Sequence, residues 1–207
     1  MTRAVGDFAV HPLVDVAGPI DTTLREAFPA ATAEQWAAAR ELDPTTFGTD
    51  DAWVLPFRAF VVVGPDDDVT VVDLGVGTTT SPAASWSPGP GRLPEGLTQL
   101  GIHPADVGTV VLTHLHEDHV GWVVGSSGLP LFANAEHVVQ RTEVAAFAEE
   151  RMILEATVDP LRAAGLLREV DGRVALRAGI DLEPTPGHTV VHQSAALAAV
   201  YREVMAS

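Results

Sequence analysis

The sequence predicts an α/β domain in which β-hairpins pack beneath helices, and three features lead to this prediction. Strand patterns come first along the chain and are followed by helices mixed with further short strands. Hydrophobic residues make up 46% of the chain and charged residues 19%, which is typical of a globular protein. A length of 207 residues without an internal repeat suits one domain better than two. We therefore expect residues 1–207 to form one layered domain.

The first half of the chain consists mainly of short β-branched runs separated by turn sequences. Its predicted elements are strands at residues 8–16, 57–63, 69–74 and 109–112, helices at 32–42 and 93–100, and a loop at 75–91. The sequence Gly64-Pro65-Asp66-Asp67-Asp68 separates the second and third strands, and its composition predicts the turn of a hairpin. The last strand leads directly to His114.

The second half of the chain mixes helical and strand patterns. Its predicted elements are strands at residues 129–132, 137–139, 166–170, 174–176 and 180–182, and a helical segment at 142–165. Pro160 is expected to divide this helical segment, because proline breaks a helix interior. Asp171-Gly172 is expected to join two of these strands, 166–170 and 174–176, as a hairpin.

The charge and the residue content exclude several classes of protein. Acidic residues outnumber basic residues by 28 to 12, and the formal net charge is −16. Such a surface repels phosphate backbones and anionic lipids, so nucleic acid and membranes are not expected partners. The chain contains no cysteine, which excludes disulfides, thiolate metal sites and cysteine nucleophiles. Neither a signal-peptide pattern nor a membrane-spanning run occurs, so we expect a cytoplasmic protein.

The segment that indicates chemistry is Thr113-His114-Leu115-His116-Glu117-Asp118-His119-Val120-Gly121-Trp122. In an extended backbone, residues two positions apart point the same way, so His114 and His116 can bind one cation. The following residues are expected to turn, which can direct Asp118 and His119 to a neighbouring point. His188, in Thr185-Pro186-Gly187-His188-Thr189, can supply the third imidazole. Three protein ligands with an open position form the usual catalytic zinc site.

These motifs carry a family resemblance. The histidine-rich segment resembles the metal signature of the metallo-β-lactamase superfamily, and Asp73 with Gly75 is similar to its aspartate-glycine loop. Pro186-Gly187-His188-Thr189 is similar to the next histidine motif of the family, and the resemblance extends over residues 52–189. The resemblance implies an αββα sandwich with metals at one edge of the sheets. It assigns His114, His116 and His188 to a first metal, and Asp118 and His119 to a second.

The resemblance does not extend to the end of the family pattern. The family supplies, further along, an aspartate that bridges the two metals and a final histidine for the second metal. Only 19 residues follow His188, and none of them is an aspartate. We therefore expect a C-terminally truncated sandwich whose second half is incomplete. We expect it to bind one zinc ion rather than two. Residues 194–205 have a helical apolar pattern, and we expect them to cover the open sheet or a homodimer interface.

Two functional hypotheses follow from these motifs. In the first, the chain is a zinc-dependent hydrolase, because zinc lowers the pKa of bound water to about 7. Asp118 would then orient the hydroxide and pass its proton to the leaving group. In the second, the incomplete site makes the chain a degenerate, non-catalytic domain that binds metal or another protein. Metal content and turnover distinguish the two hypotheses.

The resemblance also indicates the class of substrate. Gly121-Trp122 and the helices expected after residue 142 are similar to those of family members that cleave lactones and other esters. Apolar side chains that could line an acyl site, or equally belong to the core, are Trp86, Trp122, Phe147 and Met152. A thioester, as in glyoxalase II relatives, is an alternative substrate. The charge disfavours the nucleic-acid-processing members, and the sulfur-oxidising iron members use the aspartate that is absent here.

Overall fold

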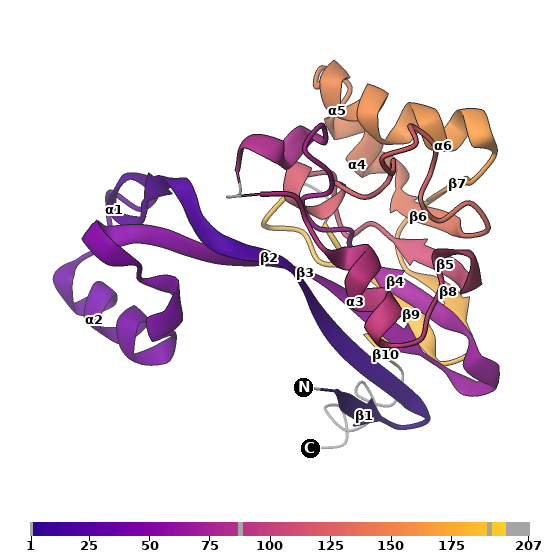
Figure 1. Cartoon of the computed structure of the whole chain (residues 1–207), viewed down its shortest axis with the longest axis horizontal. Coiled ribbons are helices and arrows are strands. Elements are labelled where there is room, and N and C mark those ends of the chain that lie inside the picture. Colours follow the sequence, from indigo (N-terminus) through magenta and orange to yellow (C-terminus); the bar gives the residue numbers. More distant parts are fainter. Residues whose placement is uncertain (1, 87–88, 190–191, 198–207) are drawn as a thin grey trace.

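The computed structural model describes residues 2–86, 89–189 and 192–197, and its strands form two sheets (Figure 1). The larger sheet has seven strands in the order of the chain: β1 (Arg3–Val5), β2 (Phe8–Thr23), β3 (Ala52–Val63), β4 (Val69–Val72), β5 (Val107–Val111), β6 (Glu136–Gln140) and β7 (Leu167–Val170). Neighbouring strands are antiparallel from β1 to β4 and parallel from β4 to β7. The carboxyl ends of β4 to β7 therefore lie at one edge of the sheet.

The smaller sheet packs against one face of the larger one. Its three antiparallel strands are β8 (Val174–Arg177), β9 (Ile180–Pro184) and β10 (Gln193–Leu197), with β9 in the middle. The residues of the large sheet that contact Leu182 of β9 in one buried cluster are Val72, Val111, Val138 and Val170. Side chains alternate along a strand, so the residues next to these valines point to the opposite face.

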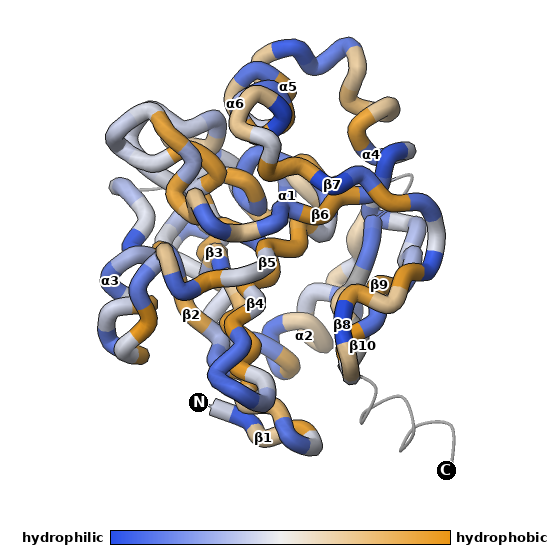
Figure 2. The backbone as a smooth tube through the Cα atoms, turned by 90° about the vertical axis from the view of Figure 1, so that its right-hand side faces the viewer, coloured by the Kyte–Doolittle hydropathy of each residue, from blue (hydrophilic) through white to orange (hydrophobic). Residues whose placement is uncertain are grey.

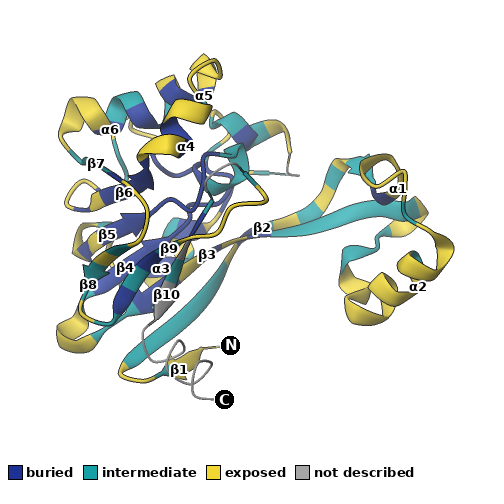
Figure 3. Ribbon diagram, turned by 180° about the vertical axis from the view of Figure 1, so that it is seen from behind, coloured by how far each residue is buried: buried dark blue, intermediate teal, exposed yellow. Residues whose placement is uncertain are grey.

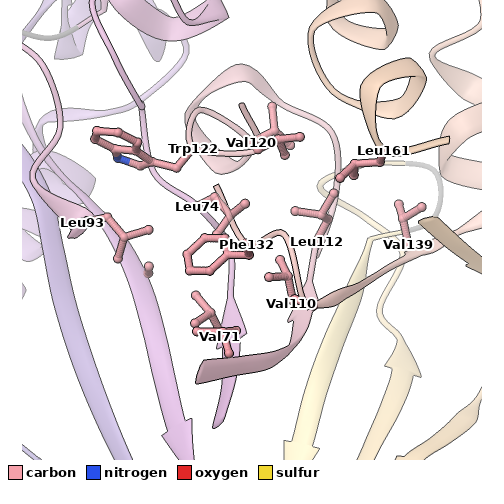
Figure 4. Close-up of a cluster of buried hydrophobic side chains, with 14 of the residues drawn as sticks. Val71, Leu74, Leu93, Val110, Leu112, Val120, Trp122, Phe132, Val139 and Leu161 are labelled. Atoms are coloured by element: carbon pink, nitrogen blue, oxygen red, sulfur yellow. The ribbon is translucent and has the colours of Figure 1, made fainter. Parts of the chain in front are cut away.

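Helices cover the opposite face of the large sheet. They are α3 (Leu93–Gln99), α4 (Arg141–Ala146), α5 (Arg151–Ala156) and α6 (Val158–Ala164). Their buried side chains join Val71, Val110 and Val139 of the strands in the main core cluster, part of which Figure 4 shows. In Figure 2 much of the backbone of β5 and β6 has the colour of hydrophobic residues. The layers are thus helix, large sheet and small sheet, and the outer helical layer of an αββα sandwich is not among the described residues.

An arm projects from this body (Figure 1). It consists of the distal halves of β2 and β3, which stay paired as far as Thr23 and Ala52, and of α1 (Leu24–Ala27) and α2 (Ala33–Leu42) between them. Thr23 and Thr32 cap the N-termini of the two helices with capping boxes. In each box the threonine hydroxyl accepts a hydrogen bond from the N–H of the third helical residue, whose side chain accepts one from the threonine N–H. Figure 3 shows that most residues of the arm are exposed or half-buried, in contrast to the strands of the body.

Short 3-10 helices connect the regular elements. They are η1 (Pro44–Thr46), η2 (Thr49–Asp51), η3 (Pro65–Asp67), η4 (Pro82–Ser85), η5 (Pro104–Asp106) and η6 (Glu117–His119). Among the described residues, no helix combines the length and the apolar character needed to cross a bilayer. The predicted strands and helices of the first half are confirmed, although β2 and β3 are longer than the patterns indicated because the arm extends them.

Two predictions about the second half were wrong because of local irregularity. Residues 129–132 do not form a strand; Pro130 makes an isolated bridge to Val124, and Leu129 is exposed. The helical segment does not break at Pro160, which lies in the first turn of α6, where no intrahelical partner for its missing N–H is needed. The chain instead leaves the helix after α4 and again at Thr157, whose backbone angles are not helical.

Two further predictions were wrong because the chain changes sheets. Asp171-Gly172 does not close a hairpin, since β7 belongs to the large sheet and β8 pairs with β9 in the small one. The expected C-terminal helix is incorrect over its first residues, because Gln193–Leu197 form β10, which pairs with β9. The rest of that expected helix, residues 198–205, lies outside the described residues.

Candidate metal centre

The histidine-rich segment follows β5 at the carboxyl edge of the parallel strands. His114 is 1% exposed and is held close to the sheet, because the preceding Leu112 N–H donates to the carbonyl oxygen of Val138 in β6. His116 precedes η6 with an extended backbone, as the spacing of the two histidines predicted. The ring centroids of His114 and His116 are 4.6 Å apart, so both side chains lie on the same side of the segment.

His188 comes from the turn between β9 and β10 of the small sheet. The base of the turn is closed by the N–H of Thr185, which donates to His192 O at 2.7 Å. The N–H of Gly187 donates to Thr189 O at 3.0 Å, and Gly187 has a φ of +144°, a conformation that favours glycine. This turn places the exposed His188 beside the histidines of the large sheet.

The three histidines meet at one point. His116 Nδ1 lies 3.1 Å from His114 Nε2 and 3.1 Å from His188 Nε2. Among the described residues, these three form a group in which one ring nitrogen from each lies within 4.8 Å of the other two. Two nitrogens that bind a tetrahedral zinc ion at about 2.0–2.1 Å are themselves about 3.3 Å apart. The two separations of 3.1 Å are therefore close to the donor spacing of a zinc site.

The hydrogen bonds around His114 also suit a cation. The hydroxyl of Thr113 donates to the Asp73 carboxylate at 2.9 Å, so its oxygen can accept from Nδ1 of His114, also at 2.9 Å. A proton on Nδ1 leaves Nε2 of the neutral ring with a free lone pair, directed at the other two histidines. Outer hydrogen bonds of this kind orient the histidine ligands of metal sites.

Two of the three histidines, His114 and His116, are also in the protonation state that a metal requires. Burial, together with the neighbouring His119 and His116, lowers the pKa of His114 to about 2. Burial and the proximity of His188 also lower the pKa of His116. Both rings are therefore neutral at pH 7, and their nitrogens are available to an ion.

Asp118 and His119 lie next to this group but form a separate cluster with Asp73. His119 Nδ1 is 2.8 Å from Asp73 Oδ2, and His119 Nε2 is 3.4 Å from Asp118 Oδ2. Burial lowers the pKa of His119, but the hydrogen bond and the charge of Asp73, assisted by Asp118, outweigh burial and raise this pKa. Among the described residues, Asp118 and His119 do not belong to a group of three potential ligands whose donor atoms meet at one point.

A cleft of about 700 Å³ opens beside the histidines. Its polar side includes His116, Asp118, His119 and His188. Its apolar side includes Trp86 and three residues of the arm, Ile20, Trp53 and Leu55. Of the other aromatic and sulfur side chains proposed for an acyl site, Phe147 lies behind His116, with ring centroids 5.9 Å apart. Trp122 is buried in the core and Met152 is 68% exposed outside the cleft.

Two buried carboxylates near the centre had no recognisable signal in the sequence. Glu143 of α4 is 0% exposed and accepts hydrogen bonds from Leu115 N and Thr189 Oγ1. Asp15 of β2 is 1% exposed and accepts hydrogen bonds from Val76 N, after β4, and from the indole N–H of Trp122, at the end of the histidine-rich segment. Each is an isolated acidic residue in a strand or helix pattern, where a solvent-exposed position is the ordinary expectation.

Sequence comparison relates the chain to known proteins. Residues 56–198 match the profile of the metallo-beta-lactamase superfamily. The N-acyl homoserine lactonase AiiA of Bacillus thuringiensis subsp. kurstaki is 33% identical over 104 residues, which are 50% of this chain and 38% of the relative. The N-acyl homoserine lactonase AiiB of Agrobacterium fabrum is 64% identical over 32 residues, 16% of this chain and 12% of the relative. The matched segments thus span well under half the length of these relatives.

Solved structures share the fold. A probable metal-dependent hydrolase from Staphylococcus aureus superposes with a TM-score of 0.75 at 19% identity, covering 92% of this chain and 69% of the other. AidC, a dizinc quorum-quenching lactonase in complex with the product N-hexnoyl-L-homoserine, superposes with a TM-score of 0.71 at 18% identity. That superposition covers 95% of this chain and 69% of AidC.

Proposed function

Because the chain belongs to the metallo-beta-lactamase superfamily, we propose that it is a metal-dependent hydrolase that cleaves a lactone or another ester. The proposed metal is zinc, held by His114, His116 and His188. The observation that carries this proposal is the convergence of three imidazoles, attached to two different sheets, on one point beside an open cleft. The donor set is entirely histidine, which suits zinc.

The proposed reaction assigns separate roles to the residues of the cleft. The ion, when bound, supplies Lewis acidity, which activates water near neutral pH and polarises a carbonyl. Asp118 would accept the proton of the attacking water and return it to the leaving oxygen. Asp73 would hold His119 in place, since their side chains are hydrogen-bonded at 2.8 Å. Asp118 and His119 would bind a second ion more weakly, because they are two ligands rather than three.

The proposed substrate carries an apolar acyl group. The curated relatives are N-acyl homoserine lactonases, and the cleft beside the histidines is apolar along Ile20, Leu55 and Trp86. An acyl chain could lie along this wall while its ester carbonyl faces the histidines. We propose that this lactone or ester is the binding partner of the protein, and that the protein is cytoplasmic. A net charge of −16 disfavours polyanions and anionic membranes as partners.

One observation favours a second candidate function, a non-catalytic metal-binding or interaction domain. Asp118 and His119 form a pair without a third ligand among the described residues, so the second metal position is incomplete there. The zinc-loaded chain would separate the two functions in a panel of lactones, esters and thioesters. Hydrolysis of any class supports the enzyme, whereas inactivity of the fully loaded protein across the panel supports the non-catalytic domain.

Removal of one imidazole is expected to abolish tight metal binding. The purified chain should hold about one equivalent of zinc, because one group of three ligands is present, and His116→Ala should hold close to none. Metal analysis by mass spectrometry after dialysis measures both values. His103→Ala is the matched control, because His103 lies before η5, at the opposite end of β5 from the centre. Two tightly held equivalents in the wild type would contradict the proposed single site.

A further inference from the structure

Glu143 is a buried carboxylate without an obvious structural purpose. It lies in the first turn of α4 and is 0% exposed. Its carboxylate takes no part in a capping box, because the helix has no side-chain cap. Glutamate is almost never fully buried unless its charge is paired or hydrogen-bonded, because removing a carboxylate from water is costly. Among the described residues, no arginine, lysine or histidine forms an ion pair with it. Its burial therefore depends on hydrogen bonds, and these bonds involve the neighbours of the metal-site histidines.

The carboxylate contacts both segments that carry the histidines. Oε1 accepts from the N–H of Leu115 at 3.2 Å, and Leu115 lies between His114 and His116. Oε2 accepts from the hydroxyl of Thr189 at 2.9 Å, and Thr189 directly follows His188. One side chain thus bridges two segments that are 72 residues apart where His116 and His188 meet.

The bridge joins the turn that carries His188 to α4. The base of this turn is fixed by the pairing of β9 with β10, and the Gln193 N–H donates to Thr113 O at 2.9 Å. His188 itself is exposed, and among the described residues next to it the hydroxyl of Thr189 bonds to the body of the protein. Loss of the bridge would remove a contact that holds Thr189, and with it the adjacent His188, in place.

We propose that Glu143 is a positioning residue that holds His188 against the His114–His116 pair and thereby sets the zinc affinity of the site. This inference rests on the proposed three-histidine metal site. Hydrogen bonds that orient metal ligands typically contribute about 10- to 100-fold in metal affinity. Glu143 acts one residue away from the ligands, so we expect an effect of about 10-fold.

The test is a zinc titration of the full chain in competition with a chromophoric chelator, with melting temperatures of the metal-free and zinc-loaded forms. Glu143→Gln keeps the size of the side chain but replaces one acceptor oxygen with a donor, so its zinc Kd should rise about 10-fold. Thr189→Val removes the other half of the bridge and should raise the zinc Kd by a similar factor. Because Thr189 lies in a turn outside the core, this variant keeps the test valid even if Glu143→Gln folds poorly. Thr189→Ser keeps the hydroxyl and should bind zinc as the wild type does.

The outcomes distinguish this inference from the proposed function. The double variant Glu143→Gln/Thr189→Val should bind zinc no more weakly than the weaker-binding single variant, because both changes break the same bridge. Unchanged zinc affinity in both single variants, with a lowered melting temperature of the metal-free form, would show a purely structural role and overturn the inference while the three-histidine site stands. A wild-type chain that does not bind zinc would overturn the metal site and this inference together.

Discussion

Asp118→Asn is expected to reduce turnover of a lactone or ester substrate by about two orders of magnitude or more, the usual scale for loss of acid–base catalysis. The substitution removes the group that would accept and return the proton. It leaves intact the three histidines whose nitrogens lie within 4.8 Å of one another, so zinc content should be unchanged. Steady-state turnover and metal analysis on the same sample measure both quantities.

The matched control for this prediction is Glu117→Gln. Glu117 belongs to the same 3-10 helix as Asp118, η6. It faces a separate cavity beside Phe147 and Glu150 and does not line the cleft beside the histidines. Its amide variant should keep turnover close to the wild-type value. Equal turnover in Asp118→Asn and the wild type would remove Asp118 from the mechanism, whereas loss of zinc in Asp118→Asn would assign it to metal binding instead.

Asp15→Ala is expected to lower the free energy of unfolding by about 3 to 5 kcal/mol, because it leaves several buried donors without an acceptor. Oδ1 of Asp15 accepts from Leu93 N at 2.7 Å and from the indole N–H of Trp122 at 2.8 Å. Oδ2 accepts from Val76 N at 2.8 Å and Gly77 N at 3.3 Å. The carboxylate thus joins β2 to the loop after β4, the start of α3 and the segment after His119.

Urea unfolding measures this loss, and Asp21→Ala is its control on the same strand. Asp21 is exposed, so its removal should change stability by less than about 0.5 kcal/mol. A similarly small loss for Asp15→Ala would show that water or rearranged side chains satisfy the donors. The close approach of Gly75 and Gly91 to Asp15 argues against such rearrangement, since an added Cβ would lie 2.3 Å and 2.0 Å from Oδ2.

The same residue should produce a defined pH dependence. Burial raises the pKa of Asp15 above its ordinary value of 3.8, although the hydrogen bonds from Trp122, Leu93 and Val76 partly oppose this. Between 3.8 and the raised pKa, the folded state binds a proton that the unfolded state has lost, so this contribution to stability falls as pH rises. The variant Asp15→Asn has no titratable group at this position. The free energy of unfolding of the wild type minus that of this variant should therefore decrease as pH rises across this window. A difference that grows with pH would contradict the raised pKa.

The convergence of the three histidines was predictable because its signal is local. His114 and His116 lie two residues apart directly after a strand, and Gly187 marks the turn beside His188, so the chemistry could be inferred from short motifs. Local turn chemistry also explains the main error. The chain bends at Gly172 but then enters the small sheet, and a turn sequence does not indicate which sheet the next strand joins.

The residues that support the centre could not be predicted in the same way. Asp15 and Glu143 acquire their roles from partners that are distant in sequence, such as Trp122 for Asp15, 107 positions away. A single acidic residue in a strand or helix pattern contains no information about such partners. The arm was missed for a related reason, since its two strands continue beyond the region where they pack against the body, and no residue type marks that point.

The division of the three histidines between two sheets has a consequence for the order of folding. His114 and His116 follow β5 of the large sheet, whereas His188 lies in a turn of the small sheet. The trio cannot exist until the sheets have docked, a contact between distant parts of the chain that forms late if local structure forms first. An ion bound there would therefore stabilise the native state more than the transition state. Zinc should slow unfolding and leave the rate of refolding nearly unchanged.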